Sequence, residues 1–233
     1  MENLPVVILA GGMGTRLKDV IHDVPKPMAP VMGKPFLEYL VMQLMRWNIR
    51  DIVMSVGYKR DCIKDYFGDG SRWDVKIKYA DEVNPLGTGG GIRNAAQFVD
   101  KGSFLVMNGD SYFDADLEGL FLLHGKKKSQ LTVALVQRND TGRYGKVEID
   151  SEGRVIAFKE KESGTPGFIN SGIYVMTKEF VALFPEGKSS FENDMIPRSV
   201  GRGVFGLPME GFFIDIGVPE DYEKACSAFK QLR

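Results

Sequence analysis

The chain has 233 residues, of which 43% are hydrophobic, and its 30 basic and 31 acidic side chains leave a net charge of −1. This balance gives no basic surface of the kind that binds nucleic acids or anionic membranes, so neither is expected as a partner. The N-terminus lacks the basic and apolar regions of a signal peptide, and no apolar run is long enough to span a bilayer. We therefore expect a cytoplasmic protein with a single domain spanning residues 1–233. The sequence leaves open whether the chain forms a homo-oligomer.

Cysteine and histidine are scarce in this chain. Its two cysteines and two histidines do not have the spacing of zinc ligands. Neither histidine lies in a nucleophile motif such as Gly-x-Ser-x-Gly. The composition therefore argues against a zinc site and against a hydrolase that depends on a histidine base.

A short apolar strand leads directly into a glycine-rich segment. Residues 9–17 read Leu-Ala-Gly-Gly-Met-Gly-Thr-Arg-Leu, and the glycines let backbone N–H groups approach a ligand. The dinucleotide-binding fingerprint is excluded because it needs a glycine where Leu17 stands. The P-loop is excluded because Gly-Lys-Ser/Thr does not follow either early glycine at the required distance. The alternative for the glycines alone is a tight turn after a core strand.

The loop over residues 11–34 is far longer than the usual connection in a compact domain, which favours a functional role. It carries Arg16, whose planar guanidinium suits phosphate oxygens, and Lys26, which lies between Pro25 and Pro27. The two prolines restrict the backbone on both sides of Lys26 and so limit where its ammonium group can point. Together with the glycines, these two cations predict a site that grips a triphosphate.

Apolar segments of strand length alternate with amphipathic segments of helix length as far as residue 137. This alternation is typical of an α/β fold with a mixed, mostly parallel central sheet flanked by helices. The clearest helix begins near Pro35 and has an apolar stripe, which we interpret as core packing. Strands are expected over residues 5–10, 52–56, 74–79, 103–108 and 130–137, and helices over residues 35–48, 59–67, 89–98 and 116–125.

From about Arg143 the pattern changes to short strands separated by turns. Val147 and Ile149, residues 155–159 and residues 168–176 have the alternation that is typical of antiparallel strands. We expect these strands to form a small antiparallel extension of the sheet on the substrate side.

Two aspartates each end an apolar, strand-like segment. Asp110 follows residues 104–107, and Asp215 follows residues 212–214. In open α/β sheets ligands bind at the carboxyl ends of the strands, and two carboxylates that bridge to substrate phosphates are a usual Mg²⁺ site. The alternative is that each aspartate only caps a turn. Beside a triphosphate grip we favour Mg²⁺ as the cofactor, with Asp110 and Asp215 as its ligands.

A series of motifs along essentially the whole chain resembles the sugar-1-phosphate nucleotidyltransferase family. The resemblance implies a Rossmann-like (GT-A-like) nucleotidyltransferase fold, without the C-terminal β-helix domain that many members carry. It also implies Mg²⁺-dependent nucleotidyl transfer to a sugar 1-phosphate. The motifs are Gly-Gly-x-Gly-Thr-Arg-Leu from residue 11, Pro-Lys-Pro-Met-Ala-Pro from 25, Gly-Lys-Pro from 33, Asn-Pro-Leu-Gly-Thr-Gly from 84, Asn-Gly-Asp from 108, Tyr-Gly from 144, Glu-Lys from 160, Asn-Ser-Gly from 170 and Phe-Ile-Asp from 213.

The resemblance also implies roles for individual residues. Arg16 would grip the triphosphate and Lys26 would lie by the reacting phosphates, so both are expected to be catalytic. Lys161 would receive the sugar phosphate, but Glu162 stands where members usually have proline, so Lys159 remains a second candidate. The expected nucleotide-binding residues are Leu9, Ala10, Gly11, Gly12, Gly14, Thr15, Arg16, Lys26, Asn84, Pro85, Gly87, Thr88 and Asn108, and the expected sugar-phosphate-binding residues are Gly145, Glu160, Lys161 and Asn170.

Within this family the chain is most similar to D-glycero-D-manno-heptose 1-phosphate guanylyltransferases, followed by mannose 1-phosphate guanylyltransferases. The resemblance implies transfer of GMP from GTP to the sugar 1-phosphate for surface glycan synthesis. A sugar 1-phosphate has a second pKa of about 6 and is already anionic at neutral pH, so the scarcity of histidine fits this reaction. A UTP- or dTTP-dependent member and a non-catalytic nucleotide-sugar sensor remain alternatives. A dinucleotide-dependent oxidoreductase is opposed by Leu17.

Overall fold

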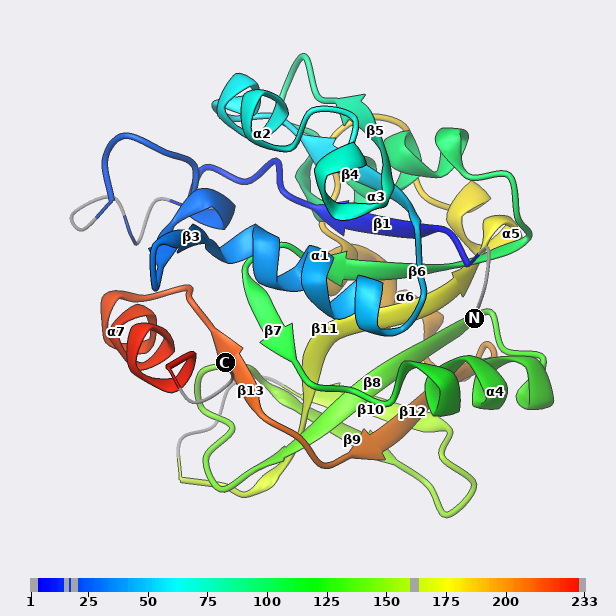
Figure 1. The fold of residues 1–233 in the computed structure, drawn as a ribbon. Helices are drawn as coiled ribbons and strands as arrows, with labels where there is room; N and C mark the ends of the chain where they lie inside the picture. Colours follow the sequence, from blue (N-terminus) through cyan, green and yellow to red (C-terminus); the bar gives the residue numbers. More distant parts are fainter. Residues whose placement is uncertain (1–3, 15–16, 18–20, 160–163, 231–233) are drawn as a thin grey trace.

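The computed structural model describes residues 4–14, 17, 21–159 and 164–230 (Figure 1). The main sheet has the strand order β10-β9-β11-β6-β1-β4-β5, β8 pairs with β11, and β12 pairs with β8. The strands are β1 (Val6–Leu9), β2 (Pro30–Val31), β3 (Lys34–Pro35), β4 (Asp51–Val56), β5 (Lys76–Asp81), β6 (Ser103–Asn108), β7 (Ser111–Phe113), β8 (Leu131–Arg138), β9 (Lys146–Ile149), β10 (Val155–Lys159), β11 (Gly167–Thr177), β12 (Val204–Met209) and β13 (Phe213–Asp215). The α-helices are α1 (Phe36–Arg46), α2 (Arg60–Phe67), α3 (Gly87–Ala95), α4 (Leu117–Lys127), α5 (Lys178–Ala182), α6 (Ile196–Ser199) and α7 (Pro219–Ala228). The expected α/β fold is confirmed.

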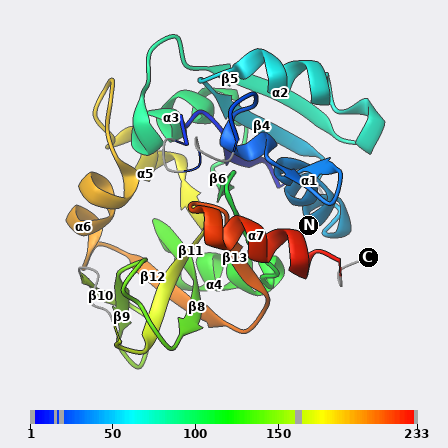
Figure 2. The same ribbon diagram turned by 90° about the vertical axis from the view of Figure 1, so that its left-hand side faces the viewer.

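Four neighbouring strands, β6, β1, β4 and β5, are parallel and form the centre of the sheet. β1 lies between β4 and β6, with Val6 beside both Ile52 and Leu105. A parallel strand that is covered on both faces is apolar along its whole length, which is why the sequence predicts β1 so clearly. The carboxyl ends of these strands lie on the side that faces the viewer in Figure 2.

The long strand β11 separates β8 from the parallel block. It pairs antiparallel with β6 on one side and antiparallel with β8 on the other. β12, which the sequence does not predict, pairs parallel with β8. β12 contains Gly206 and Pro208, residues that weaken a strand pattern and are tolerated mainly in strands paired along one side. β9 and β10 form the predicted antiparallel extension next to β11.

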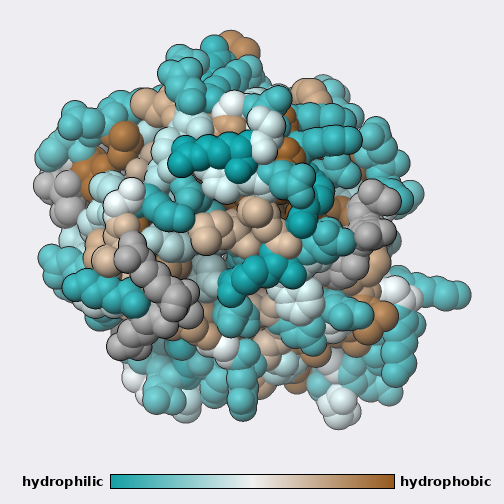
Figure 3. Space-filling model, in the orientation of Figure 1, coloured by the Kyte–Doolittle hydropathy of each residue, from teal (hydrophilic) through white to brown (hydrophobic). Residues whose placement is uncertain are grey.

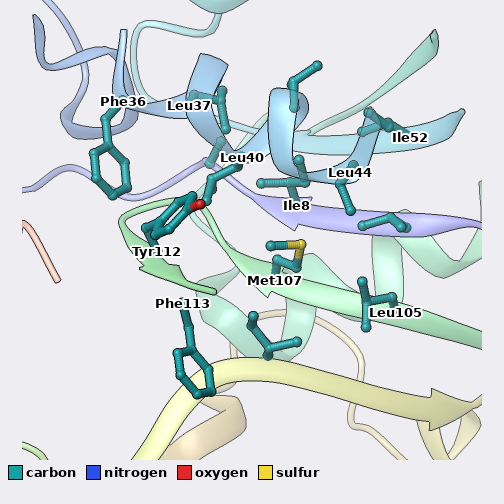
Figure 4. Packing of buried hydrophobic residues seen from close by; sticks show 14 of the residues in the cluster. Ile8, Phe36, Leu37, Leu40, Leu44, Ile52, Leu105, Met107, Tyr112 and Phe113 are labelled. Atoms are coloured by element: carbon teal, nitrogen blue, oxygen red, sulfur yellow. The ribbon is translucent and has the colours of Figure 1, made fainter. Parts of the chain in front are cut away.

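Helices cover both faces of the sheet. This agrees with β1, whose successive apolar side chains are buried on opposite faces. Val6 and Ile8 belong to the buried cluster that contains residues of α1, whereas Val7 belongs to the cluster that contains residues of α3, α5 and α6. Successive side chains of a strand point to opposite faces, so one strand contributes to both clusters. Figure 4 shows Leu40 and Leu44 of α1 packed toward the sheet, which confirms the apolar stripe as core.

The outer surface is mixed in character. The face in Figure 3 is mostly hydrophilic, and its hydrophobic residues form small separate patches. None of the helices in the described part of the chain combines the length and hydropathy that crossing a lipid bilayer demands.

His124 is buried in α4, with 4% of its surface exposed. Its Nδ1 lies 3.0 Å from Thr132 Oγ1 on β8, and Nε2 has no hydrogen-bond partner among the described residues. Burial lowers the pKa of His124 to about 4, from an ordinary value of 6.5. The folded protein therefore holds this imidazole neutral at pH values where the unfolded chain protonates it.

We expect His124 to make the folded protein less stable as the pH falls from about 6.5 toward 4. Because the unfolded chain takes up this proton first, the free energy of unfolding should fall by about 2 kcal/mol between pH 7 and pH 5 through this group alone. Urea titrations across this pH range would measure the loss. His124→Asn keeps an acceptor near the position of Nδ1 and should show a correspondingly flatter pH dependence. Equal slopes for the two proteins would contradict the assignment.

Candidate functional site

The glycine-rich segment leaves the carboxyl end of β1 and is fixed by two backbone bonds. Ala10 N donates to Ser55 O at 2.8 Å, and Gly11 O accepts a bond from Tyr58 N at 3.2 Å. A Cβ placed on Gly12 would have no atom within 4 Å, so the backbone is open to ligands there. Gly14 has a positive φ of 57°, and a Cβ there would lie 2.6 Å from Cβ of Lys26. Glycine at position 14 thus allows the stem of Lys26 to pass directly against this segment.

Lys26 begins a short 3₁₀ turn over Lys26–Met28. Pro25 precedes it in an extended conformation, and Met28 N donates back to Pro25 O at 2.8 Å. The side chain of Lys26 is only 12% exposed. The two prolines and the turn therefore restrict the backbone on both sides of Lys26, whose side chain is largely buried.

Asp110 and Asp215 lie side by side although they are more than 100 residues apart. Asp110 directly follows β6, and Asp215 is paired with Ser111 where β13 meets β7. Ile216 N donates to Asp110 O at 3.0 Å, which ties the two strand ends together. Figure 1 and Figure 2 show β13 and α7 beside this end of the sheet. The sheet topology thus brings together the two carboxylates that the sequence proposes as metal ligands.

The ammonium group of Lys26 lies between these two carboxylates. Its Nζ donates to Asp110 Oδ2 at 2.6 Å and lies 3.8 Å from Asp215 Oδ1. Burial and the negative charge of Asp110 raise the pKa of Asp215 to about 6, and the charge of Lys26 opposes this shift. Two carboxylates that repel one another in a partly buried place are a suitable donor set for a hard cation, because the cation removes the repulsion. Among the described residues no group of three His, Cys, Asp or Glu side chains could hold a metal. Substrate oxygens and water would complete the ligand set of a metal bound by the two carboxylates.

A cavity of about 330 Å³ opens beside this cluster. The side chain of Asn108 reaches it from the end of β6, and Asn108 Oδ1 is buried without a hydrogen-bond partner among the described residues. A buried acceptor without a partner is costly and is typical of a ligand site. The cavity is lined by Leu9, Gly12, Gly14, Lys26, Pro27, Thr88, Asn108, Asp110, Glu192 and Gly217.

Seven residues of this lining are among those that the sequence proposes as site residues, and the other described ones are not part of the lining. Asn170 donates from Nδ2 to the hydroxyl of Tyr174 at 2.6 Å and accepts from Gly172 N at 2.9 Å. A Cβ on Gly172 would lie 2.9 Å from Asn108 Nδ2. The turn that contains Asn170 and Gly172 therefore packs directly against Asn108 of the cavity lining. The proposed residues outside the lining are Ala10, Gly11, Asn84, Pro85, Gly87, Gly145, Asn170 and Asp215. Thr15, Arg16, Glu160 and Lys161 lie outside the described residues.

The second candidate for the sugar phosphate, Lys159, already has a partner. Its Nζ lies 2.6 Å from Glu148 Oε1 on the neighbouring strand β9, and the side chain is 55% exposed. The charge of Lys159 is thus largely matched by a carboxylate outside the cavity lining.

The glycines of α3 have a packing role that the sequence does not reveal. A Cβ on Gly87 would lie 2.5 Å from Ser189 O, and a Cβ on Gly90 would lie 2.3 Å from Gly187 O. Gly89 N donates to Ser189 O at 2.9 Å, and Ser189 N donates to Leu86 O at 2.9 Å. These glycines therefore allow a segment about 100 residues further along the chain to pack against the start of α3.

Glu82 and Glu192 are two acidic residues of this region that the sequence analysis misses. Glu82 accepts from Ser55 Oγ at 3.0 Å and from Leu86 N at 2.9 Å. A Cβ on Gly11 would lie 2.4 Å from Glu82 Oε1, so this carboxylate lies directly against the glycine-rich segment. Glu192 lines the cavity itself. Neither residue belongs to a motif with a known mechanism, and only the packing of distant segments identifies them.

Comparisons with known proteins match almost the whole chain. The profile of the family described as "Nucleotidyl transferase" matches residues 5–231. The chain is 44% identical over 220 residues to D-glycero-alpha-D-manno-heptose 1-phosphate guanylyltransferase from Campylobacter jejuni, covering 94% of this chain and 97% of that protein. It is 40% identical over 224 residues to the protein of the same name from Aneurinibacillus thermoaerophilus, covering 95% and 96%. The crystal structure of HddC from Yersinia pseudotuberculosis complexed with GMP-PN superposes with a TM-score of 0.85 at 38% identity, covering 97% of this chain and 99% of that chain.

Proposed function

Because this chain belongs to the nucleotidyl transferase family, we propose that it transfers GMP from GTP to D-glycero-D-manno-heptose 1-phosphate. The products are GDP-heptose and pyrophosphate. The protein would act in the cytoplasm, and GDP-heptose would be used for surface glycan synthesis. Two relatives that match nearly the whole chain carry the name of this guanylyltransferase. The observation that carries the proposal is the Lys26 ammonium group between Asp110 and Asp215, at a cavity bordered by open glycine backbone.

The proposed reaction needs charge neutralisation more than proton transfer. An oxygen of the sugar 1-phosphate forms a bond to the α-phosphorus of GTP, and the bond from that phosphorus to the bridging oxygen of pyrophosphate breaks. Lys26 is close enough to the cavity to contact phosphate oxygens as negative charge moves to the leaving pyrophosphate. Asp110 and Asp215 would hold Mg²⁺, which supplies further neutralisation of the phosphates when it is bound. Arg16 and Lys161, which lie outside the described residues, would grip the triphosphate and the sugar phosphate.

Glu82 is the residue that supports guanine as the base. It joins the two segments proposed to surround the base, because it lies against Gly11 and accepts a bond from Leu86 N. A carboxylate accepts bonds at about four lone-pair sites, so each oxygen of Glu82 can accept one more. Guanine presents N1–H and an amino group as adjacent donors, whereas uracil and thymine present one N–H between two carbonyl groups. An acceptor pair thus favours guanine.

Replacing Glu82 with glutamine is expected to weaken the preference for GTP. The amide offers one acceptor and one donor, so kcat/KM for GTP should fall by about 10- to 100-fold, the value of one or two charge-assisted bonds. UTP and dTTP should lose much less. Competition assays with mixed triphosphates would measure the ratio. Asp81→Asn is the matched control. Asp81 directly precedes Glu82 in the chain, but its carboxylate pairs with Lys64 at 2.7 Å. An unchanged GTP-to-UTP ratio in Glu82→Gln would place base selection elsewhere.

The proposed function is tested by pyrophosphate release with Mg²⁺ across a grid of substrates. Four nucleoside triphosphates are combined with heptose, mannose, glucose and N-acetylglucosamine 1-phosphates. The expected result is one dominant signal for GTP with heptose 1-phosphate. A dominant signal for another pair of substrates would support nucleotidyl transfer and show that the proposed substrate is wrong, with mannose 1-phosphate as the nearest alternative. Binding of GTP without turnover in any cell would favour a nucleotide-sugar sensor.

A further inference from the structure

Glu192 is a cavity-lining carboxylate to which neither the mechanism nor the family resemblance above gives a role. It lies in the first turn of a short π-helix over Phe191–Met195 and is half-buried. It lines the same cavity as Lys26 and Asp110. π-Helical turns are rare and occur frequently at functional sites. A polar side chain held in such a turn and exposed to a substrate cavity is therefore a candidate for contact with substrate.

The carboxylate of Glu192 is held in place from the nucleotide side of the cavity. Thr88 Oγ1 donates to Glu192 Oε2 at 2.6 Å, and the same hydroxyl accepts from Phe191 N at 2.8 Å. The close packing of the α3 glycines against residues 187–189 fixes the segment that carries Glu192. Thr88 thus both lines the cavity and orients Glu192, because its hydroxyl is engaged by this carboxylate and by the π-helix.

The charges in the cavity show which substrate group this carboxylate can accept. Glu192 offers only acceptors when it is ionised. Burial, and to a smaller extent the negative charge of Asp110, raise the pKa of Glu192, and the bond from Thr88 opposes this shift. Triphosphate and sugar phosphate oxygens are also negative acceptors, so contact with Glu192 would be repulsive. The hydroxyl groups of a sugar ring are neutral donors and carry no such penalty. A carboxylate at this position is suited to the sugar and unsuited to the phosphates.

The neighbours of Glu192 also lie on the sugar side. The charge of Glu192 contributes, after burial, to the raised pKa of the Tyr174 hydroxyl, which accepts a bond from Asn170 Nδ2 at 2.6 Å. Asn170 is one of the residues that the family resemblance assigns to the sugar phosphate. Phe191, the residue before Glu192, packs edge to face against the ring of Tyr174 with the centroids 4.9 Å apart, so the segment that carries Glu192 contacts both Thr88 and the partner of Asn170.

We propose that Glu192 accepts hydrogen bonds from hydroxyl groups of the sugar ring and thereby selects the sugar 1-phosphate, with Thr88 as its positioning residue. This inference rests on the proposed function, since it assigns a second substrate to the same cavity. A site that binds a substrate hydroxyl with a buried polar group rejects an analogue that lacks it, because the group loses its partner. Glu192 is the acceptor that such rejection requires.

The test compares the two substrates in Glu192→Gln, which keeps the size of the side chain and removes its charge. We expect kcat/KM for the sugar 1-phosphate to fall by about 10- to 100-fold, the value of one bond to a charged group, while KM for GTP changes by no more than about twofold. Glu186→Gln is the matched control on the same segment, because Glu186 is 89% exposed and pairs with Arg93 at 3.2 Å. It should leave both parameters unchanged.

Deoxy sugar 1-phosphates identify the hydroxyl concerned. The wild-type protein should discriminate strongly against the analogue that lacks the contacted hydroxyl, and Glu192→Gln should lose most of that discrimination at one ring position only. A purely structural role for Glu192 would lower activity with every analogue by the same factor. Equal losses for all analogues, or a larger effect on KM for GTP than for the sugar, would overturn the proposal.

A second pair of variants covers the case in which Glu192→Gln does not fold, as judged by circular dichroism. Thr88→Val removes the hydroxyl that holds Glu192, and Thr88→Ser keeps it. KM for the sugar 1-phosphate should rise in Thr88→Val and return toward the wild-type value in Thr88→Ser.

The wild-type protein is first assayed over the substrate grid, and the most active pair of substrates is used in these tests. If no pair reacts, the proposed function fails, and calorimetric titration of the sugar 1-phosphates into wild type and Glu192→Gln tests the inference separately.

Discussion

Replacing Lys26 with alanine is expected to lower kcat by about 100- to 1,000-fold, which is the usual cost of removing one preorganised group that stabilises developing negative charge. Lys26 is held by Pro25, Pro27 and the stem contact with Gly14, so its charge is already in position before the reaction. No other described cation lines the cavity to take over its role. Steady-state and single-turnover release of pyrophosphate would measure the loss.

Two controls separate this effect from a change in folding. Lys26→Met keeps the apolar stem that packs against Gly14 and removes only the charge, so it should be as inactive as Lys26→Ala. Lys34→Ala removes a partly exposed lysine of β3, which pairs with Glu38 at 2.9 Å, and should keep wild-type turnover. Activity near the wild-type level in Lys26→Met would show that the ammonium group does not act on the phosphates.

Asp110→Asn is expected to raise the Mg²⁺ concentration needed for half-maximal activity by at least about tenfold, because the amide keeps one oxygen and removes the ligand charge. Lys26 would also lose the charged partner at 2.6 Å and retain only Asp215, at 3.8 Å, as a carboxylate partner. Part of the loss should therefore remain at saturating Mg²⁺ as a lower kcat. Mg²⁺ titrations at saturating GTP and sugar phosphate would separate the two effects.

Asp114→Asn is the control for this variant. Asp114 lies four residues after Asp110, its side chain is 52% exposed, and its carboxylate lies 3.8 Å from the guanidinium group of Arg46. Its replacement should leave the Mg²⁺ titration unchanged. If Asp110→Asn also gave an unchanged titration, the metal would have to be held without Asp110, and the assignment of the two aspartates as its ligands would be wrong.

The parts of the fold that local periodicity determines could be predicted from the sequence. β1 is apolar throughout, and the centres of β4 and β6 are apolar runs of three and four residues, because these strands are covered on both faces. β12 was not predicted, because Gly206 and Pro208 weaken the pattern and its stability comes from pairing with β8. The position of β11 between β6 and β8 depends on contacts between distant segments, which periodicity does not record.

The same distinction applies to the candidate site. Lys26 and Asp110 belong to short motifs whose residue types already indicate phosphate and metal chemistry, and the structure brings them into contact. Thr88 was proposed from its motif for the nucleotide, but its hydroxyl is bonded to a residue 104 positions later in the chain. Glu192 could not be found from the sequence, because an isolated glutamate in a short irregular helix resembles any surface residue until the packing against α3 is known.

The ion pairs of Lys26 also bear on how salt should act on this protein. Nζ has three N–H donors, so Lys26 can keep its 2.6 Å bond to Asp110 and still donate to a phosphate oxygen. Both of its carboxylate contacts are much shorter than the Debye length of about 8 Å at physiological ionic strength, so salt screens them weakly. The approach of a triphosphate from solution occurs over longer distances and is screened strongly. Ionic strength should therefore slow the association of GTP while leaving the chemical step nearly unchanged.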